Sequence, residues 1–277
     1  MLIFNGCIQN QYQELLKYLL HFASEREDRT GTGTSSTFGV CLIHNLKLGF
    51  PLITTKKVFW RGVIEELAWM LRGETNVKSL QEKGVHIWDA WADDRGDLGR
   101  VYGAQWRRWT DHSRAFTIGN FDQIQALIDN IKKKPYSRRH ILNAWNVGEL
   151  HDMNLPPCHY SAQWYVNKNK QLECIMNMRS SDVFLGLPFN IAQYALLTHL
   201  LAHVTGYDVG NIRYVLGDTH LYLNHFEQAK LQLTRDKRAL PKLEVLDIDS
   251  YLWKLKPDSV KLDGYKPHPR IKAAVAV

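Results

Sequence analysis

The sequence contains little cysteine and no long apolar run, and these absences exclude several classes of protein. Its four cysteines are Cys7, Cys41, Cys158 and Cys174, and none of them forms a CxxC pair. Neither a disulfide scaffold nor a thiolate zinc cluster is therefore indicated, and a reducing compartment is the simpler interpretation. No stretch approaches the roughly 18 uninterrupted apolar residues that a membrane-spanning helix needs. Residues 1–13 lack the basic region and apolar run of a secretory signal, so we expect a cytoplasmic protein.

Internal repeats, low-complexity tracts and flexible linkers are also missing, which favours one domain over residues 1–277. Hydrophobic residues make up 45% of the chain, enough for the packed core of a globular protein. Lysine and arginine outnumber aspartate and glutamate by 35 to 28. The resulting net charge of +7 allows nucleic acid or small anions as partners, and a solvated basic surface explains it equally well.

The hydrophobic pattern predicts a mixture of helices and strands. Apolar residues recur at three- and four-residue spacing, which predicts helices near residues 12–23, 63–71, 76–84, 121–131 and 189–204. The last of these is apolar on most sides, so we expect it to be central and buried. Strand-like runs cover residues 37–42, 140–147, 160–166, 172–178, 212–216 and 243–248. Because helices and strands do not alternate regularly, we expect an α+β fold with mixed or antiparallel sheets packed with that central helix.

Cys158 lies at the start of a predicted hairpin. A polar turn over residues 167–170 joins two strand-like runs, and a turn centred between Lys168 and Asn169 places Cys158 opposite Arg179. A fixed positive charge stabilises the thiolate, which is the reactive form of cysteine, so we expect a nucleophile here. A buried structural thiol is the alternative for Cys158, and it is our interpretation of the other three cysteines.

Several arginines are candidates for binding phosphate. Arg138 and Arg139 are adjacent, and two planar guanidinium groups side by side suit a phosphate. Arg29, and Arg179 with Ser180, offer similar chemistry. No interleaving of aromatic and basic residues accompanies them, which favours a phosphate pocket over a nucleic-acid groove. A solvated basic face is the alternative for the adjacent pair.

Glu66 is a candidate general acid or base. It shares the apolar stripe of its predicted helix with Met70, whereas Glu65 turns toward Trp69 and Arg72. A carboxylate that faces the core is costly unless it is paired or used, and burial raises its pKa toward neutrality. A buried ion pair is the alternative for Glu66.

Three more polar residues are candidates for contacting a nucleoside. The amide of Asn190 presents one donor and one acceptor, which complement the N3 donor and O4 acceptor of uracil. A helix cap explains Asn190 equally well. His220 and Tyr222 alternate as on a strand and could reach a sugar hydroxyl together, although a core histidine is the more common case for an isolated His220.

Taken together, the sequence resembles the thymidylate synthases over nearly its whole length. Seven dispersed blocks carry the resemblance, and they cover residues 28–34, 50–56, 87–93, 137–139, 157–159, 179–190 and 217–222. They read DRTGTGT, FPLITTK, IWDAWAD, SRR, PCH, RSSDVFLGLPFN and GDTHLY. The resemblance implies a single α+β domain that forms a homodimer through a sheet face, and the reductive methylation of dUMP by 5,10-methylenetetrahydrofolate.

The resemblance also implies roles for individual residues. Cys158 would add to C6 of the pyrimidine, which divides one difficult substitution into easier steps. The implied catalytic set is Cys158, Glu66, Tyr102, Asn190 and Asp182. The implied dUMP-binding set is Arg29, Arg138, Arg139, Arg179, Ser180, Asp182, Asn190, His220 and Tyr222, with Arg138 and Arg139 supplied by the other subunit. The implied folate-binding set is Ile87, Trp88, Asp182, Gly186, Phe189 and Ala276, and no metal is implied.

Some positions depart from the family pattern. Met178 stands where the family usually has Gln, Phe59 where many members have His, and Ser161-Ala162 where aromatic residues are common. The run over residues 177–180 resembles the pyrimidine-nucleotide hydroxymethylases, so a dUMP hydroxymethylase is the alternative function. The tryptophans of the third block and the apolar C-terminal segment favour methylation, because hydride transfer requires that water be kept out. An RNA-binding or regulatory protein is a further, less favoured alternative.

Overall fold

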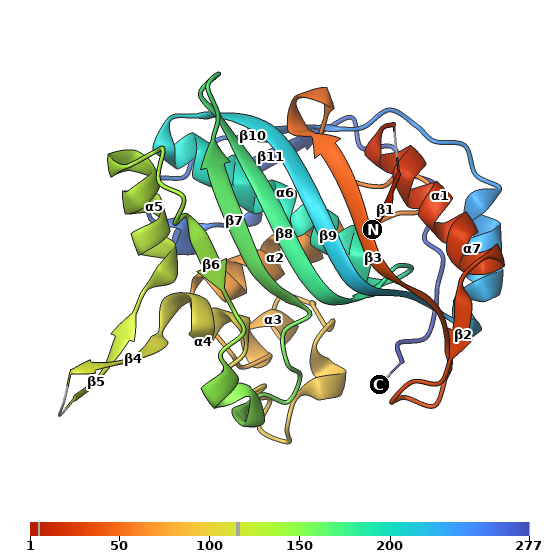
Figure 1. Ribbon diagram of the computed structural model, residues 1–277, viewed down its shortest axis with the longest axis horizontal. Coiled ribbons are helices and arrows are strands. Elements are labelled where there is room, and N and C mark those ends of the chain that lie inside the picture. Colours follow the sequence, from red (N-terminus) through yellow and green to blue (C-terminus); the bar gives the residue numbers. More distant parts are fainter. Residues whose placement is uncertain (5, 115–116, 277) are drawn as a thin grey trace.

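The computed structural model describes residues 1–4, 6–114 and 117–276, and it confirms the expected α+β class. Its main sheet is mixed, with the strand order β1-β3-β9-β8-β7-β6 and β2 paired to β3 (Figure 1). These strands are β1 (Leu2–Ile3), β2 (Ser24–Arg26), β3 (Thr34–Asn45), β6 (Ile141–Asn143), β7 (His159–Val166), β8 (Gln171–Asp182) and β9 (Asp208–Tyr222). Two small two-stranded sheets, β4–β5 (Trp109–Arg114 and Thr117–Phe121) and β10–β11 (Lys242–Val245 and Val260–Asp263), lie outside it.

The helices pack mainly against one face of this sheet (Figure 1). They are α1 (Ile8–His21), α2 (Trp60–Leu71), α3 (Lys78–Gln81), α4 (Tyr102–Arg107), α5 (Gln123–Lys133), α6 (Gly186–Thr205) and α7 (Phe226–Leu233). Helix α6 is buried on most sides and ends at Gly206, whose φ of 78° is in the left-handed region that favours glycine. The central buried helix expected from the sequence is therefore confirmed, although it begins three residues earlier.

Several expected boundaries were wrong. The run 140–147 forms only a three-residue strand, β6, because it lies at the sheet edge and then turns into the 3₁₀ helix η3 (Val147–Asp152). The runs 37–42 and 212–216 are the centres of longer strands, β3 and β9, which pair with each other along most of their length. Pairing with a neighbour stabilises polar strand ends that show no hydrophobic alternation, so their extent is not visible in the sequence.

The hairpin β7–β8 differs from its expected register by one residue over most of its length. Ser161 pairs with Asn177 and Val166 with Leu172, which centres the turn on Asn169. A β-bulge between His159 and Ser161 then takes up the difference. As a result the Arg179 amide donates to the Cys158 carbonyl at 2.8 Å, as the sequence predicted for this pair.

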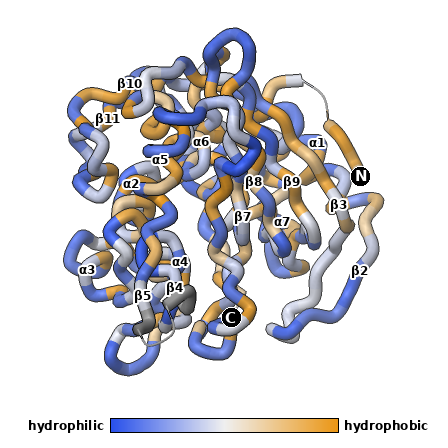
Figure 2. Tube along the Cα trace, turned by 60° about the vertical axis from the view of Figure 1, so that its left-hand side comes forward, coloured by the Kyte–Doolittle hydropathy of each residue, from blue (hydrophilic) through white to orange (hydrophobic). Residues whose placement is uncertain are grey.

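The strands alternate between a buried and a solvent-facing side. Along β7 and β8 the buried apolar members are Ala162, Trp164, Val166, Leu172, Cys174, Met176 and Met178. This alternation of hydrophobic and hydrophilic residues can be followed in Figure 2. The opposite face leaves large apolar side chains in solvent, among them Phe38, Tyr165 and Ile175. This face of the sheet therefore lacks the cover that the helices give to the other.

Candidate active site

Cys158 and Arg179 are held together where β7 begins and β8 nears its end. The Arg179 guanidinium lies 3.9 Å from the Cys158 Sγ, measured from Nη2. It also donates to the Pro157 carbonyl at 2.9 Å and to the Pro156 carbonyl at 2.7 Å. These bonds fix the guanidinium against the loop that precedes the cysteine, so the positive charge stays beside the sulfur.

Burial outweighs this charge in setting the pKa of the Cys158 thiol. The net shift is upward, with burial as its largest cause. Arg179 lowers the pKa, as the sequence predicted, and the charge of Asp182 raises it. The net shift is upward because a buried anion loses more solvation than one guanidinium at 3.9 Å restores.

Tyr102 positions the same cysteine through its backbone. The Cys158 amide donates to the Tyr102 hydroxyl at 2.7 Å. The Tyr102 ring stacks on His159, with centroids 4.1 Å apart and an interplanar angle of 20°. His159 in turn shares a 2.9 Å hydrogen bond with the Tyr194 hydroxyl. Burial, followed by the Cys158 charge, holds the pKa of Tyr102 well above its ordinary value.

Glu66 is buried on α2 with two neutral donors. The Trp88 indole donates to its Oε1 at 2.8 Å, and the Gln193 amide donates to its Oε2 at 2.9 Å. Burial raises the pKa of Glu66 to about 7, and the two hydrogen bonds oppose the rise. The expected core-facing carboxyl with a raised pKa is confirmed, and neither donor is charged, so the ion-pair alternative does not apply.

The neighbouring Glu65 has a partner that the sequence did not predict. Its carboxylate is also buried, and it forms a 2.8 Å ion pair with Lys83. Glu65 and Trp69 are four residues apart on α2 and share one face of it, as expected, and Arg72 pairs with Glu74. The loop after α3 brings Lys83 to this carboxylate, and the spacing within α2 alone does not reveal that loop.

Asp182, Gly186 and Asn190 meet at the start of α6. Asp182 Oδ1 accepts the Phe184 amide at 3.0 Å and the Leu185 amide at 3.1 Å. A methyl group placed on Gly186 would lie 3.7 Å from the Asp182 Cβ and 3.8 Å from the Asn190 Oδ1. The Asp182 and Asn190 side chains therefore both border the space beside Gly186, which has no side chain of its own.

The end of β9 brings His220 and Tyr222 to this region, because Ser180 pairs with Asp218 and Asp182 with His220. The His220 Nδ1 lies 2.9 Å from the Asp218 Oδ1, and its ring lies 5.1 Å from that of Tyr222. The pKa of Tyr222 is raised to about 12, chiefly by burial and then by the charge of Asp182.

Arg29 reaches the same region from the loop between β2 and β3. Its charge lowers the pKa of Tyr222, which places the guanidinium within electrostatic range of that hydroxyl. Asp28 shapes the loop, since it accepts the Gly33 amide at 2.8 Å and the Thr30 amide at 2.9 Å. In Figure 1 the C-terminal end of the chain lies near this loop.

Five of the seven blocks of the sequence thus contribute to one region of the fold, namely 28–34, 87–93, 157–159, 179–190 and 217–222. A comparison with protein families agrees with the resemblance. The sequence model of the family described as thymidylate synthase matches residues 10–277. The chain belongs to the thymidylate synthase family. Members of this family are methyltransferases of nucleotide biosynthesis, and they use methylenetetrahydrofolate.

Arg138 and Arg139 are the two expected phosphate ligands that the single chain keeps away from Cys158. Both are exposed and precede β6. The Trp164 amide donates to the carbonyl of His140, the next residue, at 2.9 Å. Trp164 is six residues beyond Cys158 along β7, which corresponds to about 20 Å at about 3.3 Å per residue. These arginines therefore do not join the Cys158 region of their own chain.

Of the residues expected to hold folate, Trp88 donates to Glu66, whereas Asp182, Gly186 and Phe189 lie at the start of α6. The Trp88 ring is packed among those of Trp69, Trp91 and Tyr102. Ile87, Phe189 and Ala276 are half-buried. Ala276 belongs to the C-terminal segment, which a 2.7 Å hydrogen bond between His225 and the Ala274 carbonyl attaches to the end of β9.

Sequence reasoning missed three residues that shape this region. Gln193 binds Glu66, Trp145 lies 5.7 Å from the Arg179 guanidinium, and Lys56 donates to the Phe184 carbonyl beside Asp182. Burial lowers the pKa of Lys56 to about 7. A polar residue in an otherwise apolar helix was the available signal for Gln193. Lys56 and Trp145 gave no comparable signal, because their contacts come from distant segments.

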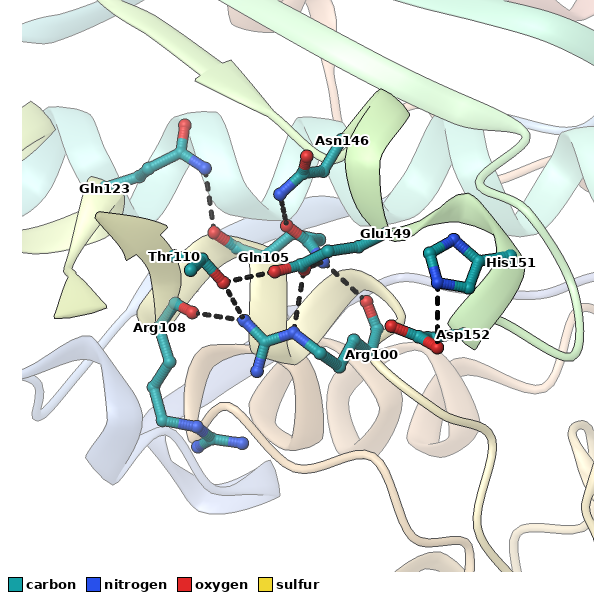
Figure 3. A network of polar contacts seen from close by, with 9 residues as sticks. All are labelled: Arg100, Gln105, Arg108, Thr110, Gln123, Asn146, Glu149, His151 and Asp152. Atoms are coloured by element: carbon teal, nitrogen blue, oxygen red, sulfur yellow. Dashed lines mark hydrogen bonds and ion pairs between the residues drawn. The ribbon is translucent and has the colours of Figure 1, made fainter. Parts of the chain in front are cut away.

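A polar network fixes the segment that leads to Cys158 (Figure 3). Arg100 and Gln105, just before and within α4, both donate to Glu149 of η3 at 2.7 Å. Thr110 of β4 donates to the second Glu149 oxygen, and Asn146 donates to Gln105 at 3.3 Å. Glu149 thus joins the helix that carries Tyr102 to the chain approaching the cysteine.

Within 1–4, 6–114 and 117–276, no helix has the length and hydropathy to cross a membrane. Over the same ranges, no three His, Cys, Asp or Glu side chains come together as metal ligands.

Proposed function

We propose that this protein is a thymidylate synthase, which converts dUMP to dTMP with 5,10-methylenetetrahydrofolate as donor of both carbon and hydride. One observation carries the proposal: Cys158 lies beside Arg179, with its amide fixed by Tyr102, and within electrostatic range of Asp182, which lies near Asn190 at the start of α6. A nucleophile, an anion-binding group and a base-reading amide are the parts that addition to a pyrimidine nucleotide needs.

Binding of dUMP follows from this arrangement. Arg179 and Arg29, with Ser180, would hold the phosphate, and planar guanidinium groups suit its oxygens. The Asn190 amide would accept from N3–H and donate to O4 of uracil, a pattern that cytosine reverses. His220 and Tyr222 would bind the sugar 3′-hydroxyl, with the His220 ring oriented by Asp218.

The covalent step begins at Cys158. Its thiolate would add to C6, so that C5 becomes the carbon nucleophile, and the Arg179 charge favours this anion. Glu66 has a pKa of about 7, so at neutral pH it can either supply or accept a proton. We assign Glu66, with Tyr102, to the protons at O4 and C5.

The residues around the start of α6 fit a folate. A pterin presents adjacent N–H donors, and the half-buried Asp182 carboxylate is an acceptor for such donors. Trp88 and Ile87 would form an apolar wall, and Phe189, Gly186 and the segment containing Ala276 would complete the site. When bound, the folate supplies the one-carbon unit and the hydride. The role of the residues named here would be to orient the folate and to exclude water.

We further propose that the active enzyme is a homodimer joined through the uncovered sheet face. The exposed Phe38, Tyr165 and Ile175 lie on this face, and Arg138 and Arg139 lie near its edge. A second copy related by a twofold axis would cover the apolar residues and bring these arginines to the partner's phosphate site. Cys158→Ala and Arg138→Ala chains, each inactive alone, should then regain part of the activity when mixed in hybrid dimers.

One assay tests the main proposal. The protein is incubated with dUMP and methylenetetrahydrofolate, and the products are weighed by mass spectrometry. A methylated nucleotide with dihydrofolate supports the synthase. A hydroxymethylated nucleotide with tetrahydrofolate supports the hydroxymethylase, the alternative indicated by Met178. Cys158→Ala should abolish turnover and keep nucleotide binding, and retained turnover in that variant would contradict the assignment of the nucleophile.

A further inference from the structure

Gln193 is a buried amide that touches the carboxyl group of Glu66. It projects from α6, is 1% exposed, and donates from Nε2 to Glu66 Oε2 at 2.9 Å. Its Oε1 is buried and has no hydrogen-bond partner among the described residues. A buried polar atom without a hydrogen-bond partner destabilises the fold, so this oxygen, which lies beside a titrating carboxyl group, points to a role in the titration.

The two donors to Glu66 are not equivalent. The Trp88 indole nitrogen only donates, so it suits Oε1 when that oxygen carries no proton. The glutamine amide carries a donor and an acceptor at the end of one rotatable bond. With Nε2 toward Glu66 it serves the ionised carboxylate. With Oε1 toward Glu66 it accepts an O–H from the protonated acid.

We propose that Gln193 is a positioning residue that serves both states of Glu66 by turning over its amide, and that it thereby places the acidic proton on Oε2. The oxygen that now lacks a partner is the acceptor for that proton. Trp88 excludes the proton from Oε1, because two hydrogens would then face each other.

This placement matters for the proposed reaction, on which this part of the inference rests. Gln193 and Asn190 are three residues apart on α6 and therefore share one face of the helix. The proton on Oε2 thus lies toward the side of the helix that carries the amide proposed to read the uracil ring. Without Gln193, Glu66 would have no acceptor to choose between its two oxygens.

Other titrating groups near Glu66 can be distinguished from it by their pKa values or by their ion pairs. Tyr102 of α4 senses the Glu66 charge, but burial raises its pKa well above the ordinary value. Cys158, beyond Tyr102, also has a raised pKa. Glu65, on the next position of α2, is paired with Lys83. Lys56, which donates to the Phe184 carbonyl, also has a pKa of about 7, but it is an amine. A carboxyl titration near neutral pH in this cluster therefore belongs to Glu66.

Gln193→Met tests the proposal, since methionine fills a similar volume and lacks both amide groups. The substitution removes the bonds to both forms, and the bond to the ionised form is the stronger because its acceptor is charged, so the apparent pKa of Glu66 should rise by about one unit. Infrared or carbon NMR titration of the carboxyl, without substrate, measures this directly. If thymidylate formation also occurs, kcat at neutral pH should fall about tenfold and its pH profile should shift to higher pH, with KM for dUMP changing less than about twofold.

Thr198→Val is the matched control. Thr198 is a buried polar residue on the same helix, and it donates to the Tyr194 carbonyl at 2.8 Å, away from Glu66. Substitution of Thr198 should leave the apparent pKa of Glu66 unchanged. If Gln193→Met does not fold, Gln193→Glu keeps an acceptor without a permanent donor, and it should move the titration in the same direction. An unshifted titration in a folded Gln193 variant would overturn the inference, whether or not the enzyme makes dTMP.

Discussion

At the scale of single residues, Cys158 shows how opposing effects set reactivity. Burial raises the pKa of its thiol and the Asp182 charge adds to the rise, whereas Arg179 lowers it. The reactivity of the thiol therefore depends on Arg179, whose guanidinium the β7–β8 hairpin holds beside it. Glu66 differs, since neutral donors oppose burial there and leave its pKa at about 7. The two groups are tuned by different means within one region of the fold.

Arg179→Gln should make Cys158 less reactive. Removing the charge leaves the burial uncompensated, so the pKa of the thiol should rise by about one unit and alkylation by iodoacetamide at pH 8 should slow several-fold. The measurement uses a Cys7→Ser background, because Cys7 is exposed and would also react. Arg179→Lys, which keeps the charge, should recover part of the rate. Equal rates for Arg179→Gln and its parent would contradict the role given to this arginine.

At the scale of elements, the active region is assembled where several segments are tied to one another. The β-bulge between His159 and Ser161 brings Cys158 opposite Arg179, and Glu149 joins η3 to α4 ahead of it. The α4 side of this joint carries Tyr102, whose hydroxyl accepts the Cys158 amide. The position of the cysteine therefore depends on contacts that contain no catalytic group.

Glu149→Ala should test this dependence. It removes an ion pair with Arg100 and leaves the donors of Gln105 and Thr110 without an acceptor, so the free energy of unfolding should fall by about 2 kcal/mol. Urea denaturation measures the loss, and turnover should fall as the cysteine segment loosens. Glu227→Ala removes an exposed ion pair with Lys230 and should leave both quantities nearly unchanged. Similar effects of the two substitutions would contradict the proposal that Glu149 links η3 to α4 and so positions the cysteine.

At the scale of the whole molecule, buried titrating groups make the fold sensitive to acid. Burial lowers the pKa of His159 to about 3 and that of His199 to about 4. Such groups contribute stability that is complete above the unfolded pKa of about 6.5 and is lost as pH falls toward the folded value. Glu66 acts in the opposite direction, because its raised pKa makes its contribution greatest at low pH.

The fold should therefore lose stability between pH 7 and pH 5. Over this interval each of the two histidines should lower the free energy of unfolding by about 2 kcal/mol, and Glu66 should raise it by about the same amount as one histidine lowers it. Urea midpoints at the two pH values measure the net change. In His199→Leu the decrease should be about 2 kcal/mol smaller than in the parent. An unchanged difference between the two pH values would show that His199 is not held neutral by burial.

The amino-acid sequence alone was sufficient for the α+β class, the central buried helix, the pairing of Cys158 with Arg179 and the core-facing Glu66. These depend on local periodicity and short spacing, which chain geometry carries directly into structure. The tertiary structure decided the partners of those residues. Trp88 and Gln193 reach Glu66 from 22 and 127 residues away, and burial of Cys158 outweighs the effect of the Arg179 charge on the pKa of the thiol. Desolvation and hydrogen bonding between distant segments depend on how elements pack, and no pattern along the chain records that packing.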